Sequence, residues 1–249
     1  MVNIDYSNIM KDPSDYITED EMIKFKEHFK AQGLTRMALL VWTLFRTGRR
    51  ISEIVGINPK NYNTHYPGLR PCDFDTKTKK IRFYILKKNH VKRMDKQGKI
   101  KPDEKVKKEL FEKQPKERWI MYDIKTFDIL YRFCEANNIP PFECIFPYGR
   151  VVVDRMIKKA AKELNLVREG EKYIKNKVTG IKEKRPKQFH PHCFRHGFGK
   201  QFMNKNPNDP RALIILNRIL DHSSLDLTAR YSDQEDMEAK ETLDKAFNR

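Results

Sequence analysis

The sequence lacks several features that mark large classes of proteins. It has no run of 18 apolar residues, so we expect no transmembrane helix. Its first residues, MVNIDYSNIMKDPSDY, show no basic region followed by an apolar stretch, which argues against a secretory signal. Its four cysteines are scattered without a CxxC pair, which predicts reduced thiols and not a disulfide or zinc framework. We therefore expect an intracellular, cytoplasmic protein with no membrane partner.

Positive charge is abundant and unevenly placed. The formal net charge is +17 over 249 residues. Residues 76–118 hold 17 Lys/Arg and 6 Asp/Glu, and residues 168–189 hold 8 against 3, so little net charge is left for the rest. Two basic segments on a nearly neutral body favour a face that binds a polyanion, for which nucleic acid is the usual partner. The alternative is a solvated lysine-rich surface.

Most of the chain has helical periodicity. Helices are predicted over 17–32, 34–56, 123–137, 151–166, 192–204, 209–220 and 234–247. Thr18 and Glu21 have the spacing of a capping box, Gly48 marks a break in the second helix, and Asp209 is the expected N-cap of the helix over 209–220.

One segment has strand periodicity instead. In KIRFYIL, residues 80–86, Ile81, Phe83 and Ile85 alternate with the residues between them. The charged residues 87–118 are expected to end this sheet as a hairpin and loop, and residues 168–189 to form a basic loop. The prediction is a mainly α domain with one small antiparallel sheet (α+β).

The stretch HPHCFRHGFG, residues 190–199, concentrates three histidines and an arginine. Such a cluster suits either a metal ion or a phosphate. A metal site would need further carboxylate or cysteine ligands nearby, and Cys193 lies on a different face of the predicted helix. A phosphate site needs arginine and histidine donors on one helical face, and His192 and Arg195 are at i, i+3. The phosphate interpretation is the better one, and we expect no metal and no other cofactor.

Two further stretches fit the same chemistry. TGRRISEI, residues 47–54, places Arg50 three residues before Glu53, whose carboxylate can orient the guanidinium. LDHSSLDLTARYSD, residues 220–233, places His222 nine residues before Tyr231.

Together the three stretches resemble the motifs of the tyrosine recombinase (phage integrase) family. TGRRISE resembles its TGxRxSE motif, HPHCFRHGF its HxxRH motif, and LDHSSLDLTARYSD its C-terminal histidine and tyrosine motif. The resemblance extends from residue 17 to about residue 245 and implies the catalytic-domain fold of that family. It implies a recombinase or integrase that cuts and rejoins double-stranded DNA through a 3′-phosphotyrosyl intermediate, without metal or ATP.

The resemblance also implies a role for each matching residue. Tyr231 would attack the scissile phosphate, and Arg50 and Arg195 would hold its nonbridging oxygens. His192 would assist removal of the tyrosine proton, His222 would donate to a nonbridging oxygen, and Glu53 would orient Arg50. A lysine after the strand would protonate the leaving oxygen. Strand alternation does not decide between Lys87 and Lys88, and Lys88 is preferred. The basic segments suggest these DNA contacts: Lys92, Arg93, Lys182, Lys184, Arg185 and Lys187.

The sequence departs from the family pattern at several points. Asp221 stands where a glycine is usual, so the turn before His222 either avoids positive φ or lets an aspartate adopt it. Arg49 stands at a position that is usually apolar. Residues 1–16 are interpreted as an extension or linker and residues 17–249 as the catalytic domain, either a fragment or a minimal enzyme.

Family members assemble as tetramers on DNA, and the thin apolar stripe of the helix over 234–247 suits docking on a neighbouring protomer. The alternatives are a type IB topoisomerase-like enzyme and a noncatalytic basic DNA-binding protein of the same fold.

Overall fold

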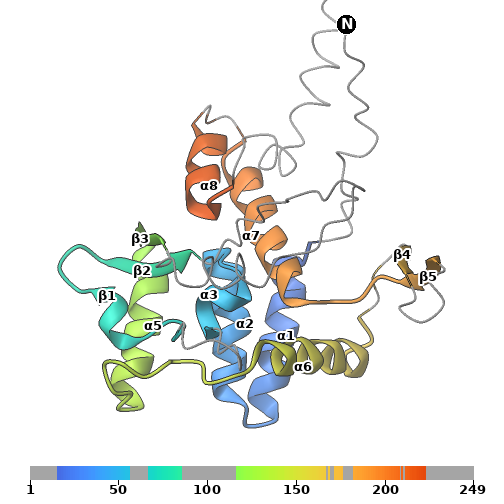
Figure 1. The fold of residues 1–249 in the computed structure, drawn as a ribbon, viewed down its shortest axis with the longest axis horizontal. Helices are drawn as coiled ribbons and strands as arrows, with labels where there is room; N and C mark the ends of the chain where they lie inside the picture. Colours follow the sequence, from blue (N-terminus) through green and yellow to red (C-terminus); the bar gives the residue numbers. More distant parts are fainter. Residues whose placement is uncertain are drawn as a thin grey trace, which may run out of the picture. The chain divides into compact units, whose positions relative to one another are not determined.

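The computed structural model describes residues 16–56, 67–85, 116–166, 168, 171–175, 182–207, 209 and 211–222. The helices (Figure 1) are α1 (Glu19–Ala31), α2 (Thr35–Thr47), α3 (Ile51–Val55), α5 (Ile124–Ala136), α6 (Arg150–Glu163), α7 (Pro191–Lys205) and α8 (Ala212–Leu220), with a 3₁₀ turn, η3, at Pro71–Asp73. The strands are β1 (Phe74–Asp75), β2 (Lys80–Ile85), β3 (Lys116–Met121), β4 (Glu171–Lys175) and β5 (Lys182–Pro186). The chain divides into two compact units, residues 1–50 with 153–249 and residues 51–152. In the described part of the chain no helix has the length and apolar composition needed to cross a membrane.

Helix α1 begins at the predicted capping box. The backbone N–H of Glu21 donates to the Thr18 hydroxyl at 3.2 Å, and the Thr18 N–H donates to the Glu21 carboxylate at 2.9 Å. Two of the N–H groups that lack a partner inside the helix are thereby satisfied. Helix α2 ends at Gly48, which adopts a left-handed φ of 61°, and α3 begins three residues later. The predicted break at Gly48 is therefore confirmed.

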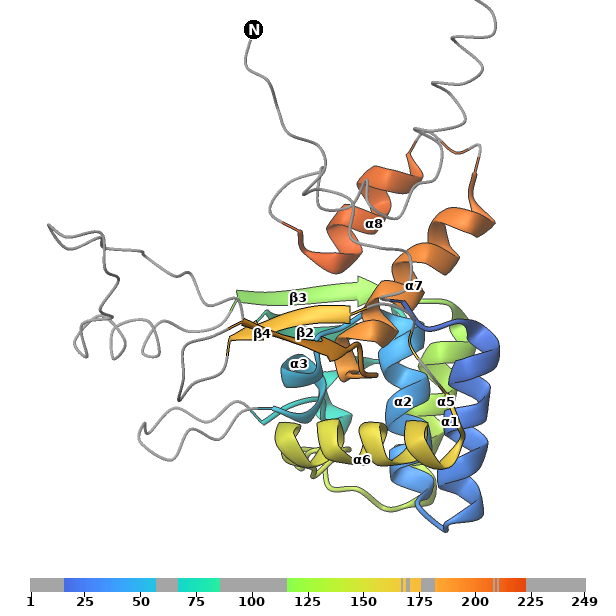
Figure 2. The same ribbon diagram turned by 90° about the vertical axis from the view of Figure 1, so that its right-hand side faces the viewer.

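In the first unit, α1 packs on α2, α2 on α7, and α7 on α8 (Figures 1 and 2). Phe25 of α1 makes edge-on contacts with Phe194 of α7, at 5.7 Å between ring centroids, and with Phe189 at 5.4 Å. The backbone before α1 also meets α7, because the Ile17 N–H donates to the Cys193 carbonyl at 3.2 Å. Gly197 permits this approach: a Cβ added there would collide with the Ile17 carbonyl oxygen.

The second unit contains the three-stranded antiparallel sheet, in the order β1–β2–β3. Ile81, Phe83 and Ile85 are buried while the residues between them are only partly buried, as the alternation predicted. Phe74 and Phe127 pack edge to face on the buried side, 5.4 Å between ring centroids.

Strand β3 was not predicted, because KERWIM begins with three charged residues. It pairs with the full length of β2, with Arg82 opposite Trp119. Only one face of β3 is covered: Ile120 is 9% exposed, whereas Trp119 and Met121 are 47% and 61% exposed. An edge strand tolerates such a composition because its pairing depends on backbone groups and one buried face.

The prediction of a loop over 168–189 was wrong. Strands β4 and β5 form an antiparallel ribbon in this segment, with Tyr173 opposite Lys184 and Lys172 opposite Arg185. Backbone hydrogen bonds form the ribbon. Its side chains are mostly charged and show no strand periodicity, so the sequence did not predict it. The prediction of Asp209 as N-cap was also wrong. Helix α8 starts at Ala212 with Arg211 in the N-cap position, and the Asp209 carboxylate instead accepts the Arg211 N–H at 2.9 Å.

Candidate active site

The first motif lies where α2 ends. The Gly48 N–H donates to the Leu44 carbonyl at 3.1 Å, and the left-handed φ at Gly48 then turns the chain out of the helix. Glycine is also required by packing, because an added Cβ would collide with the Phe198 ring and lie 2.8 Å from Leu220. The turn leads directly into Arg49 and Arg50. Arg49 is fully buried and Arg50 partly buried, so the two adjacent arginines have different environments.

The second motif forms the first turns of α7. His190 is the N-cap and Pro191 the first helical residue, a position that suits proline because its nitrogen needs no helical partner. His192 is exposed, and its ring meets that of His196 edge to face with 4.6 Å between centroids. This contact fits the i, i+4 placement predicted for the pair. Arg195, three residues after His192, is only 1% exposed.

The third motif begins at the end of α8. Asp221 is its C-cap and adopts φ 50° and ψ 49°, and the His222 N–H donates to the Asn217 carbonyl at 3.2 Å. Of the two conformations considered for this turn, the aspartate therefore adopts the left-handed one. Asp and Asn are the residues other than glycine that visit this region most readily. His222 follows directly and is partly buried.

Arg195 joins the three motifs. Its Nη1 donates to the Gly48 carbonyl at 2.7 Å, and its Nη2 donates to the Leu220 carbonyl at 2.5 Å. Gly48 is the C-cap of α2 and Leu220 the last residue of α8, so both carbonyls lie where a helix leaves its acceptors without internal partners. Helix C-termini also carry partial negative charge, which favours a cation there. One buried guanidinium thus holds two helix ends beside the α7 turn that carries His192.

The remaining predicted residues are distributed as follows. Glu53 lies in α3 of the second unit and is 2% exposed. Lys187 is partly buried and directly follows β5, which contains Lys182, Lys184 and Arg185. The residues that lie outside the described part of the chain are Lys87, Lys88, Lys92, Arg93, Tyr231 and the predicted helix over 234–247. Among the described residues, no group of three or more His, Cys, Asp or Glu side chains is placed to hold a metal ion.

Sequence reasoning missed two features. The burial of Arg49 had no sequence signal beyond its unusual position in the motif. A cluster of Arg70, Asp73 and Arg82 in the second unit is linked by ion pairs. Its spacing of three and nine residues has no simple periodicity, because a turn and a strand bring the residues together.

Comparison with known proteins yields one matching family model and several solved structures of similar fold. The family model described as the phage integrase family matches residues 15–238. A search of curated proteins found no match. Among solved structures, the crystal structure of XerA recombinase is 18% identical with a TM-score of 0.52, covering 94% of this chain and 65% of that one.

Two further structures have the same fold. XerH site-specific recombinase bound to a palindromic difH substrate is 16% identical with a TM-score of 0.52, covering 92% of this chain and 52% of that one. The Tn1549 transposon integrase in complex with transposon right end DNA is 18% identical with a TM-score of 0.53, covering 94% of this chain and 67% of that one. The chain thus spans about half to two thirds of the length of these structures. At such identities the likeness shows the fold, which is mainly helical with a small antiparallel sheet.

Proposed function

Because the chain belongs to the phage integrase family, we propose that it is a site-specific DNA recombinase that cuts and rejoins DNA through Tyr231. The observation that carries this proposal is the pair of hydrogen bonds from Arg195 to Gly48 and Leu220. These contacts bring Gly48 of the first motif and Leu220 of the third motif to α7, which carries the second motif. Motifs gathered by one buried guanidinium are expected to act on one substrate group.

In the proposed reaction the Tyr231 oxygen forms a bond to the scissile phosphorus while the bond from phosphorus to the 5′-oxygen breaks. His192 assists removal of the phenolic proton, and Lys88 or Lys87 delivers a proton to the departing oxygen. The 3′-phosphotyrosyl bond retains the energy of the phosphodiester. A 5′-hydroxyl then attacks this bond and rejoins the DNA, so no ATP is required.

Charge development explains the choice of the other residues. Negative charge grows on the nonbridging oxygens in the transition state, where Arg50, Arg195 and His222 would act as donors. Fixed donors of this kind contribute roughly 3–4 kcal/mol each when they are preorganised. The carbonyl contacts of Arg195 supply preorganisation, because they fix the plane of its guanidinium. A phenol with an ordinary pKa of about 10 also needs a cationic surrounding to react near neutral pH. Glu53 would support Arg50.

The proposed partner is double-stranded DNA, bound by a tetramer that spans two duplexes. The formal charge of +17 favours a polyanion, and solved structures of the same fold are complexes with DNA. The β4–β5 ribbon contributes Lys182, Lys184 and Arg185, and a two-stranded ribbon has a size that the major groove admits. Lys187, Lys92 and Arg93 are further proposed phosphate contacts.

Covalent capture tests the proposal and identifies the target. The protein is incubated with a pool of nicked duplexes that have a randomised core, and adducts that survive detergent are recovered and sequenced. Tyr231→Phe should bind DNA as the natural protein does and form no adduct, because only the attacking hydroxyl is removed. Tyr131→Phe, in α5, is the matched control and should form the adduct normally. An undiminished adduct from Tyr231→Phe would refute the assignment of the nucleophile.

The alternatives predict different results in the same assay. A noncatalytic DNA-binding protein would form no adduct with any duplex. A type IB topoisomerase-like enzyme would form an adduct and relax supercoiled plasmid without exchanging strands. A metal-dependent site at the histidines would lose cleavage in EDTA and regain it with a divalent ion, whereas the proposed mechanism continues in EDTA.

A further inference from the structure

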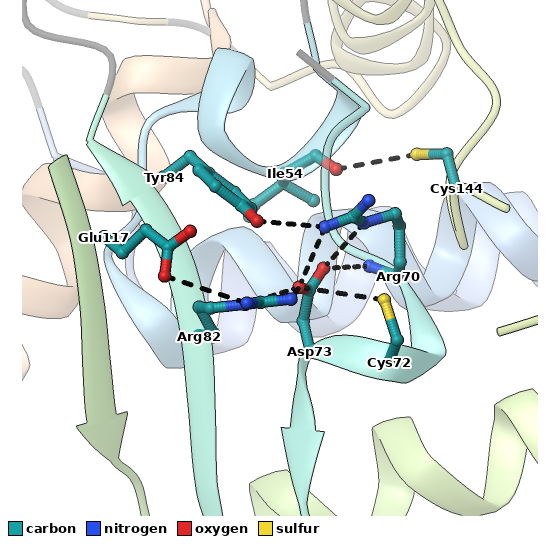
Figure 3. Close-up of polar contacts among 8 residues, drawn as sticks. All are labelled: Ile54, Arg70, Cys72, Asp73, Arg82, Tyr84, Glu117 and Cys144. Carbon is teal, nitrogen blue, oxygen red and sulfur yellow. Dashed lines mark hydrogen bonds and ion pairs between the residues drawn. The ribbon is translucent and has the colours of Figure 1, made fainter. Parts of the chain in front are cut away.

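A fully buried carboxylate holds together the sheet of the second unit. Asp73, at the end of η3, has no exposed surface. Its Oδ2 accepts from the backbone N–H of Arg70 at 3.0 Å and from Arg70 Nε at 3.1 Å. Its Oδ1 accepts from Arg70 Nη2 at 3.2 Å and from Arg82 Nε at 2.9 Å, and Arg82 Nη2 lies 2.8 Å away. Figure 3 shows the two guanidinium groups converging on this one carboxylate.

The network extends from the turn across two strands. Arg70 Nη2 also donates to the Tyr84 hydroxyl at 3.1 Å. Arg82 lies over the Trp119 ring of β3, 5.4 Å from its centroid, and its Nη1 is 3.7 Å from the Glu117 carboxylate. Asp73 therefore connects the turn before β1 to the middle of β2, and Arg82 connects β2 to β3.

Burial of the Asp73 carboxylate costs free energy, because the charged group loses its hydration. A buried carboxylate is tolerated only when cationic donors compensate for its lost hydration. Burial works against the charged form of Arg70 and Arg82, yet their hydrogen bonds and charge interaction with Asp73 raise the pKa of each guanidinium above its ordinary value. Both arginines therefore stay charged throughout the stable pH range, and the network of Arg70, Asp73 and Arg82 is called the brace.

The position of the brace suggests its role. Arg82 lies in the middle of β2, and the chain that leaves β2 at Ile85 reaches Lys87 and Lys88 two and three residues later. Those lysines lie outside the described residues, but the strand that delivers them is fixed at Arg82. These contacts join β2 to the turn before β1 at Arg82, so their loss would free β2 to shift relative to that turn.

We propose that Asp73 is a positioning residue for the proton donor of the cleavage step, acting through Arg82 and β2. This inference rests on the proposed function. The departing 5′-oxygen of DNA is a strongly basic alkoxide unless it receives a proton, and a displacement of about 1 Å in a catalytic group costs on the order of 100-fold in rate. Loss of the brace should therefore slow cleavage at the stage that needs the lysine and leave the other parts of the site working.

A substrate with a better leaving group separates this role from a general effect on folding. In a duplex with sulfur replacing the bridging 5′-oxygen at the scissile phosphate, the phosphorus–sulfur bond breaks and a thiolate leaves. A thiol has a pKa of about 8.5 and departs without prior protonation. A variant that only misplaces the proton donor is slow on the oxygen substrate and recovers on the sulfur substrate.

The experiment measures adduct formation by the full chain on the duplex recovered by covalent capture, in oxygen and sulfur forms. Asp73→Asn keeps the shape of the side chain and removes its charge. Arg82→Lys keeps the charge and loses the two-point contact, which provides a second, milder variant. Asp75→Asn is the matched control, because this aspartate at the end of β1 accepts from Thr78 and Lys77 and takes no part in the brace. Lys87→Ala and Lys88→Ala show how the rates on the oxygen and sulfur substrates change when the proton donor is removed.

We expect Asp73→Asn and Arg82→Lys to lose about 10- to 100-fold on the oxygen substrate and to come within about threefold of the natural protein on the sulfur substrate. Asp75→Asn should match the natural protein on both. An equal loss on both substrates, or no loss on either, would overturn the inference while leaving the proposed function intact. Failure of the natural protein to form an adduct with either substrate would instead overturn the proposed function and the inference with it.

Discussion

The Nη1 atom of Arg195 lies 2.7 Å from the carbonyl oxygen of Gly48, although 147 residues separate them in sequence. The bond places a buried cation on the C-cap of α2, one residue before the pair of adjacent arginines. A side chain proposed to hold the substrate phosphate therefore also holds the turn that delivers Arg50. The proposed phosphate contact and the local fold would therefore depend on the same guanidinium group.

Arg195→Lys should impair both stability and cleavage. A lysine keeps the charge but lacks the planar pair of Nη donors, so at least one buried carbonyl loses its partner, at roughly 1–3 kcal/mol of unfolding free energy. The adduct yield should fall about 10²–10³-fold. Chemical denaturation and covalent capture measure the two effects. Arg155→Lys, at an exposed position of α6, is the control and should change neither. A variant as stable as the natural protein would contradict the bridging role of Arg195.

Gly48→Ala should be more destabilising than Gly33→Ala. Both glycines have left-handed φ values, 61° and 72°, so alanine costs about 1 kcal/mol at either position. An added Cβ at Gly33 meets nothing within 4 Å, whereas at Gly48 it collides with Phe198 and approaches Leu220. Overpacking of this kind adds about 1–3 kcal/mol. Denaturant titration of the two variants measures the difference, and equal losses would show that the contact with Phe198 is not constraining.

DNA affinity should fall steeply with salt. Each phosphate contact contributes about −0.9 to the slope of log K against log salt concentration. Lys184→Gln and Arg185→Gln together should make the slope shallower by about 1.8 if both residues contact phosphates. Lys159→Gln is the control, because Lys159 is an exposed residue of α6 paired with Glu163 at 3.6 Å. Titrations followed by fluorescence anisotropy give the slopes. An unchanged slope in the double variant would exclude the β4–β5 ribbon from the DNA contacts.

Removal of residues 234–249 should abolish cooperative assembly and leave a folded protein that still binds DNA. Leu243 and Phe247 share one face of the predicted helix, with Ala239 one turn earlier, and this stripe is too thin to stabilise an isolated helix. Docking on a neighbouring protomer would bury it and link the position of Tyr231 to assembly. Sedimentation of both proteins on a DNA with two target sites decides the question. Equal assembly, or unfolding of the truncated protein, would mean that the segment packs on its own protomer.

The sequence predicted the helices well because each helix is indicated by residues that lie close together in the sequence. The Thr18–Glu21 capping box, the apolar face of α2 and the break at Gly48 are all short-range features, and each is confirmed. Strands β3, β4 and β5 escaped prediction because their pairing is made by backbone groups, which charged side chains do not reveal. Asp209 has the chemistry of an N-cap, but it serves the loop before α8 and not the helix itself.

The sequence predicted which residues form the candidate site, but it did not predict their hydrogen bonds or their burial. Motif order pointed to Arg195 and His222, but nothing in the motifs indicated that Arg195 would bond to two carbonyls. The different burial of Arg49 and Arg50 likewise depends on packing around the end of α2. Asp73 was missed because its partners come from a turn and a strand, whose contacts follow from the three-dimensional fold.

The bond between the Ile17 N–H and the Cys193 carbonyl has a mechanical consequence. Tension on the chain ahead of α1 would reach the first turn of α7 directly, because the backbone there is anchored on the helix that carries His192. The close approach at Gly197 leaves no slack to absorb such a displacement. Tension on the chain ahead of α1 would therefore act on two points of the first unit, the Arg168 side chain that donates to the Tyr16 carbonyl and the turn of α7 that carries His192.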